Sequence, residues 1–327
     1  MPVRRISLLL LVLVGASVVP AAAQEITDTR SFQVGVWLQD VYDLSVADGS
    51  FSASFWIWSR GINATREPLK TMQFVNMSES TEAESLYQQQ QKGPIYWSQR
   101  LVQGKFRYDW DVSNFPFDRH SLRIVVDEGL EDTSAFRYLV DSRGSSYSDK
   151  IALDGWRITG FKLEGRPVVY NTTFGNPTLS YDNRSFYPEL VMTLDIQRDE
   201  LMSFIKLLSI LYLSFALSLV TYFLPHDALD GRIGLAVGAL FAGAFNMREV
   251  SATLGSDQGL TLADQIHIIA LVLIGVATVV AMMSNRMVAS GWSPKQIDRF
   301  NYITCAIAAV SFVVINVVLI AIAVQQG

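Results

Sequence analysis

The feature that most constrains this chain is a set of long charge-free segments in its last third. Three of them, residues 207–224, 266–283 and 302–324, contain no Asp, Glu, Lys or Arg. Each is long enough to cross the roughly 30 Å hydrocarbon layer of a bilayer as a helix. Composition agrees, because only 17% of the residues are charged, against about 25% in soluble domains. The chain is therefore expected to span a membrane.

A fourth segment, residues 233–247, is uncharged but differs in kind. It is rich in Gly and Ala, and Arg248 and Glu249 follow it directly. Small residues suit close contact between helices better than contact with lipid tails. We therefore expect four membrane helices within a domain at 200–327, at about 201–224, 231–253, 262–286 and 299–324.

Residues 1–23 have the composition of a secretory signal peptide. Arg4 and Arg5 precede an apolar stretch, and Ala21, Ala22 and Ala23 fit a small-residue cleavage site. An uncleaved anchor helix is the alternative. Residues 24–199 would then be extracellular or periplasmic. The balance of basic and acidic residues in the links between helices agrees with this orientation. Because the exported part contains no cysteine, we expect a multi-pass protein of the bacterial inner (cell) membrane.

Residues 24–199 have an all-β pattern. In residues 50–60, Phe51, Phe55 and Ile57 alternate with serines and tryptophans, as expected for strands with one buried face. Short strands separated by turn residues predict an immunoglobulin-like sandwich. Residues 78–92 are polar and rich in helix formers, so we expect a short helix or a loop there.

The composition also argues against two classes of function. No run of five Lys or Arg residues is present, so no nucleic-acid partner is expected. The three histidines, His120, His226 and His267, are scattered, and no nucleophile or phosphate-binding motif accompanies them. We therefore expect no enzyme activity, no cofactor and no metal site.

One face of the second membrane helix could line a pore if several copies surround a common axis. Rings of carboxylates favour cations, and apolar constrictions can gate by losing water. The pore-lining residues predicted on this basis are Asp230, Gly234, Gly238, Phe241, Phe245 and Glu249. Two alternatives remain open: a helix buried for packing alone, and a pore lined by the neighbouring ladder Ile233, Val237, Leu240, Ala244 and Met247.

The order of these parts resembles the pentameric ligand-gated ion channels, the Cys-loop receptor superfamily, in its bacterial type without the disulfide. Residues 106–124, FRYDWDVSNFPFDRHSLRI, are similar to the loop that carries the aromatic-Pro-Phe-Asp signature of that family. Residues 153–161, 187–200 and 230–241 resemble a later strand, the last strand and the start of the pore helix. The resemblance implies a homo-oligomer of five subunits in contact with membrane lipid.

The resemblance also implies roles for residues at the domain junction. Phe115, Pro116 and Phe117 would pack between the sandwich and the helix tops. Asp118 would pair with Arg198, the alternative being that each is separately solvated. These five residues form the predicted gating interface.

An agonist site is implied between subunits, beneath the hairpin at 171–186. Its predicted residues are Tyr170, Phe174, Tyr181, Phe186 and Tyr187, whose rings could hold a cation or simply pack the hairpin. Four outer acids could bind calcium or respond to pH: Asp127, Glu128, Glu131 and Asp132. We therefore predict a ligand- or proton-gated channel that conducts cations. A non-conducting envelope receptor or sensor is the alternative, and a transporter ranks third.

Overall fold

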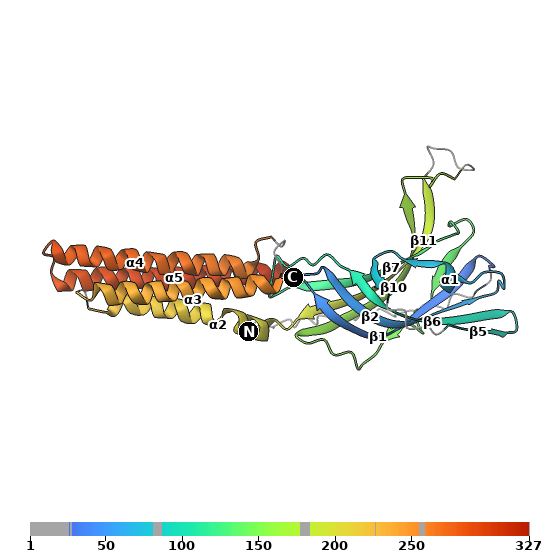
Figure 1. The fold of residues 1–327 in the computed structure, drawn as a ribbon, viewed down its shortest axis with the longest axis horizontal. Coiled ribbons are helices and arrows are strands. Elements are labelled where there is room, and N and C mark those ends of the chain that lie inside the picture. The colour runs from blue at the N-terminus through green and yellow to red at the C-terminus, as the bar shows by residue number, and fades with distance from the viewer. Residues whose placement is uncertain are drawn as a thin grey trace, which may run out of the picture.

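The computed structural model describes residues 26, 28–80, 87–176, 184–225, 227–254 and 259–326. The described chain forms an elongated molecule with strands at one end and a bundle of helices at the other (Figure 1). A long hairpin projects sideways from the strand domain, and the last helix runs back to the junction between the two parts.

Two sheets make up the N-terminal domain. The larger sheet has the order β4-β6-β2-β1-β8, with β5 added beside β6 and β9 beside β1. The smaller sheet has the order β10-β11-β7-β3. The strands of the larger sheet are β1 (Ser31–Ser45), β2 (Ser50–Gly61), β4 (Met77–Ser80), β5 (Tyr87–Lys92), β6 (Ile95–Arg107), β8 (Arg137–Val140) and β9 (Ser146–Tyr147). Those of the smaller sheet are β3 (Met72–Phe74), β7 (Arg119–Glu128), β10 (Trp156–Tyr170) and β11 (Ser185–Arg198).

The core of this domain lies between the two sheets. Phe51, Phe55 and Phe106 are buried there, and the rings of Phe51 and Phe106 stack with centroids 5.6 Å apart. Burying each such ring stabilises the fold by about 1.5–3 kcal/mol relative to exposure. The alternation in residues 50–60 thus places the aromatic side of β2 in the core. The predicted sandwich followed by a four-helix bundle is confirmed.

The prediction for residues 78–92 was wrong in the part that the structure describes. Strand β4 occupies 77–80 and strand β5 occupies 87–92, and both pair with β6. Residues 81–86 lie outside the described residues. The polar, glutamine-rich sequence of β5 has little strand propensity, but its six residues pair in register with Ile95–Arg100 of the neighbouring strand. The pairing with β6 therefore outweighs the low strand propensity of the β5 sequence.

Four helices follow the sandwich: α2 (Glu200–Val220), α3 (Leu229–Leu254), α4 (Leu262–Ala289) and α5 (Pro294–Gln326). A short helix α1 (Pro68–Thr71) lies in the strand domain, and a 3₁₀ turn η1 (Thr221–Phe223) follows α2. All four long helices are apolar and long enough to cross a membrane, which indicates a multi-pass membrane protein. Helices α4 and α5 extend past the apolar spans, so only residues 290–293 separate them.

The start of α4 is fixed by a reciprocal cap. Thr261 accepts a hydrogen bond from the Asp264 backbone N–H at 3.1 Å, and Asp264 accepts one from the Thr261 backbone N–H at 3.0 Å. Such a capping box satisfies two backbone donors that the first turn of a helix leaves free. It therefore sets where the chain enters α4, next to the sandwich.

Candidate functional site

Helix α3 turns one face toward its neighbours and leaves the opposite face open. It packs against α2 and α4. The buried face contains Arg232, Ala236, Ala239, Gly243, Asn246, Val250 and Leu254. All six residues of the predicted pore face, Asp230, Gly234, Gly238, Phe241, Phe245 and Glu249, are exposed in the single chain. Phe241 and Phe245 are 69% and 64% exposed. In the alternative ladder, Ile233, Leu240 and Met247 are half-buried, whereas Val237 and Ala244 are also exposed.

The glycines of α3 bear on whether its small residues serve packing inside the chain or line a pore. A Cβ at Gly243 would lie 3.0 Å from a Leu271 methyl group, so this glycine allows α4 to approach. A Cβ at Gly234 or Gly238 would meet no atom of the described residues within 4 Å. Packing inside the chain therefore explains Gly243 but not the two glycines of the exposed face.

Charged groups mark both ends of the exposed face. Asp230 and Glu249 are 19 residues apart in one continuous helix, which places them about 28 Å apart along its axis. This matches the roughly 30 Å thickness of the hydrocarbon layer. Arg248 is also exposed beside Glu249, so the end nearer the sandwich carries charges of both signs. Asp230 lies in the first turn, where a helix favours negative charge.

Polar contacts tie α3 to α4 near the sandwich. Asn246 Oδ1 lies 3.1 Å from His267 Nε2, and His267 Nδ1 lies 2.7 Å from the Ala263 carbonyl. Both ring nitrogens thus face oxygen atoms, which a neutral ring can satisfy only if the Asn246 amide turns its nitrogen toward Nε2. Ser251 donates to Asp264 at 3.2 Å. These contacts couple the position of α3 to that of α4.

The loop with the Phe-Pro-Phe sequence lies at the junction of the two domains. Phe115 and Pro116 are buried and are joined by a cis peptide bond. The Phe117 ring contacts Phe204 of α2, with centroids 5.8 Å apart. In the same loop, the Ser113 carbonyl accepts a hydrogen bond from the backbone N–H of Leu262 at 2.9 Å. The loop therefore contacts both α2 and the start of α4.

Asp118 and Arg198 form an ion pair at this junction. Arg198 Nε donates to Asp118 Oδ1 at 2.7 Å, and Asp118 Oδ2 lies 2.8 Å from His120 Nε2. The side chains of Asp118 and His120 are 1% exposed, and that of Arg198 is 14% exposed. Burial alone would raise the pKa of Asp118, but hydrogen bonds from His120 and Arg198 outweigh it and hold this pKa below its ordinary value.

Two tryptophans that were not predicted from the sequence complete this cluster. The Arg198 guanidinium lies 4.0 Å from the Trp156 ring centroid and 4.8 Å from that of Phe115. Trp110 contacts the His120 ring edge-on at 4.8 Å. Their only sequence signal is position, because Trp110 precedes the Phe-Pro-Phe loop and Trp156 lies in the segment 153–161.

Three of the five predicted ligand-site aromatics gather on the projecting hairpin. The rings of Tyr170, Phe174 and Tyr187 contact one another edge-on, with centroids 5.3–5.9 Å apart. Phe186 is adjacent to Tyr187 in β11, so it points to the other face of the hairpin. Tyr181 lies outside the described residues. Within the chain these rings pack on one another, and Phe174 remains 61% exposed.

The four outer acids do not form one site among the described residues. Asp127 accepts a hydrogen bond from the Tyr170 hydroxyl. Burial raises the pKa of Asp127, and the Asp127 contact raises the pKa of Tyr170 to about 12. Glu128 accepts from Thr71 at 2.9 Å, Glu131 pairs with Arg66 at 3.4 Å, and Asp132 accepts from Ser134. No group of three or more His, Cys, Asp or Glu side chains suited to a metal ion occurs in the described part of the chain.

Comparison with known proteins adds no family assignment. No protein-family model matches the chain, and no curated protein matches it.

Proposed function

We propose that this protein is an ion channel whose pore forms between the α3 helices of several copies arranged around one axis. The observation that carries this proposal is the open face of α3, with two glycines that no neighbour in the chain explains. The same helix has the lowest mean hydropathy of the four. A surface that is poor in contacts and only weakly apolar suits water better than acyl chains.

Cations are the proposed permeant ions. Each copy would contribute Asp230 at one mouth and Glu249 at the other, and rings of carboxylates concentrate cations. Between them, the exposed rings of Phe241 and Phe245 would form an apolar constriction. Arg248 reduces the negative charge at the mouth nearer the sandwich, so Asp230 is proposed as the stronger selectivity determinant.

Gating is proposed to pass through the domain junction. The Phe-Pro-Phe loop contacts α2 and α4, and α4 holds α3 through Asn246 and His267. A ligand or proton that binds the sandwich better in one state shifts the equilibrium toward that state. The aromatic cluster Tyr170, Phe174 and Tyr187 is the proposed ligand-contacting surface, completed by a second copy of the chain. By resemblance to the bacterial pentameric channels, five copies would assemble.

Purified full-length protein in planar bilayers tests this proposal. We expect unitary currents whose reversal potential follows the cation gradient, recorded across a panel of ligands and pH values. Asp230→Asn should reduce the preference for cations, whereas Asp298→Asn, near the start of α5, should not. A complete absence of unitary currents under the whole panel would instead favour a non-conducting receptor. The short links, 221–228 and 290–293, offer that alternative no output domain between the helices.

A further inference from the structure

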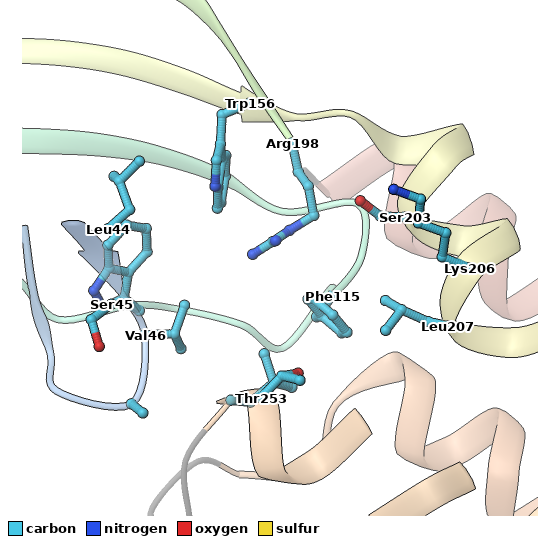
Figure 2. Close-up of a pocket in the computed structure, with 13 residues that line it drawn as sticks. Leu44, Ser45, Val46, Phe115, Trp156, Arg198, Ser203, Lys206, Leu207 and Thr253 are labelled. Carbon is cyan, nitrogen blue, oxygen red and sulfur yellow. The ribbon is translucent and has the colours of Figure 1, made fainter. Parts of the chain in front are cut away.

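A cavity of about 390 Å³ lies at the junction between the sandwich and the helices. Its wall combines the turn between β1 and β2, the loop before β7, the ends of β10 and β11, the first turns of α2 and the last turn of α3. Figure 2 shows the Arg198 side chain between Trp156 and Phe115, with Lys206 and Leu207 of α2 on the same side of the cavity as Ser203. The cavity therefore borders segments of both domains at their junction.

The wall of this cavity is electropositive. Arg198 and Lys206 line it, and none of its 13 lining residues is acidic. Arg198 is neutralised by Asp118 at 2.7 Å. Lys206 is exposed, and no ion pair of its ammonium group is found among the described residues. One positive charge in the wall thus has no counterion from this part of the chain.

One residue of the cavity wall carries a buried hydrogen-bond donor without an acceptor. Trp110 lines it and is 2% exposed. The buried indole N–H of Trp110 has no hydrogen-bond partner within the residues that the structure describes. Buried donors in folded proteins almost always have a partner, so this group indicates a missing acceptor. Much of the remaining wall is apolar, including Leu44, Val46, Leu207 and Leu254.

We propose that this cavity binds a monocarboxylate that carries an apolar tail. Its single negative charge matches the one unpaired ammonium, Lys206, and a small turn of the buried Trp110 ring would let a carboxylate oxygen accept the hydrogen bond that the Trp110 N–H lacks. The tail packs on the leucine and valine side chains of the wall. A bound molecule would hold the β1–β2 turn, α2 and α3 at one spacing, and so would stabilise that arrangement of the two domains.

Calorimetry on the purified full-length protein in detergent tests this inference, because it measures binding of a probe and does not require the protein to conduct ions. The probes are 3-phenylpropanoate, its neutral amide 3-phenylpropanamide, and decanoate. We expect the acid to bind about tenfold more tightly than the amide, because a charge-assisted hydrogen bond is lost in the amide. Tighter binding of decanoate would indicate a membrane-derived fatty acid, and tighter binding of 3-phenylpropanoate a water-soluble acid.

Two variants and one control locate the site. Lys206→Gln should abolish the preference for the acid over the amide, and Trp110→Phe should weaken acid binding severalfold while keeping an aromatic ring. Lys295→Gln, at an exposed lysine at the start of α5, should leave the affinity unchanged. Equal affinity of the wild type for acid and amide, or an unchanged preference in Lys206→Gln, would overturn the proposal. Because the readout is binding, such a failure would leave the channel proposal standing, and a non-conducting protein could still bind the acid.

Discussion

The buried carboxylate of Asp118 makes the main polar contacts at the end of the sandwich that faces the helices. Its carboxylate is held by Arg198 of β11 and by His120 of β7, the strand that begins directly after Asp118. Arg198 in turn lies over Trp156. The ion pair thus fixes the end of β11, two residues before α2 begins. Breaking a buried pair from one side leaves an uncompensated charge and costs about 3–5 kcal/mol.

Asp118→Asn should therefore destabilise the protein strongly at neutral pH, measured as a fall in Tm. The pKa of Asp118 is lowered in the folded state, so its stabilising contribution is complete above the ordinary Asp pKa and is lost as the pH falls through the lower folded pKa. The Tm difference between wild type and variant should be constant above about pH 5 and should narrow below about pH 4.

The matched control for this prediction is Asp28→Asn. Asp28 also pairs with an arginine, Arg30, at 2.9 Å, but both side chains are more than a third exposed, and exposed pairs contribute little. A Tm loss in Asp118→Asn no larger than that in Asp28→Asn would show that the junction pair does not stabilise the fold.

At the residue scale, the sequence allowed part of this cluster to be predicted. Asp118 and Arg198 were paired through the resemblance, although 80 positions separate them. Trp110, Trp156 and His120 were not placed around them, because ring contacts depend on which strands pair. The register of β7 with β11 sets His120 opposite Ile196, and no local pattern contains that information.

At the scale of elements, α3 is the part whose burial pattern has the clearest consequence. Its apolar rings Phe241 and Phe245 face away from the other helices. If they form the constriction, replacing either with Ala removes the apolar barrier. We expect Phe241→Ala and Phe245→Ala to raise the open probability without a stimulus by about tenfold, equivalent to about 1.4 kcal/mol, in single-channel recordings.

Phe223→Ala is the control, because Phe223 is 67% exposed but lies outside α3. It should leave gating unchanged. If both α3 variants also gated and conducted like the wild type, the pore face would have to be the neighbouring ladder of Ile233, Val237, Leu240, Ala244 and Met247.

The contact between α3 and α4 gives a second prediction at this scale. Asn246→Leu and His267→Leu each leave a buried polar partner unsatisfied, which costs about 1–3 kcal/mol. The double variant should therefore be less destabilised than the sum of the two, as measured by Tm in a double-mutant cycle.

Asn316→Leu is the matched control, because Asn316 accepts from Tyr212 at 3.0 Å and joins α5 to α2 instead. It should lower stability similarly without changing channel opening, whereas the Asn246 and His267 variants should change both. Strict additivity of the two α3–α4 variants would contradict the coupling.

Some elements of this fold could be predicted from the sequence, and others could not. The helix spans followed from charge-free runs, because a bilayer imposes a minimum length on any apolar helix. Strand β5 was missed, because its glutamines pair with β6 only through the register of the whole sheet. The open face of α3 could be proposed from spacing, but which residues of α3 are buried depends on the packing of α2 and α4, which no local pattern contains.

At the scale of the whole molecule, the proposed pore cannot exist in one chain. The single chain supplies one wall, with Asp230 and Glu249 at its ends and exposed glycines and rings between them. The same molecule exposes large apolar side chains on α5, such as Val310 and Val313, which suit lipid. In the proposed assembly, the open face of α3 therefore borders water and α5 borders acyl chains.

Accessibility of cysteines along α3 tests this assignment most directly. Cys305 is the sole cysteine, so Cys305→Ser provides a background for Gly234→Cys, Gly238→Cys and Phe245→Cys. In the membrane-assembled protein, all three should react with a hydrophilic cationic thiosulfonate, while Val310→Cys on α5 and Ala236→Cys on the buried face of α3 should not. If none of the three α3 cysteines reacted under any ligand or pH condition, α3 would not border water and the channel account would be wrong.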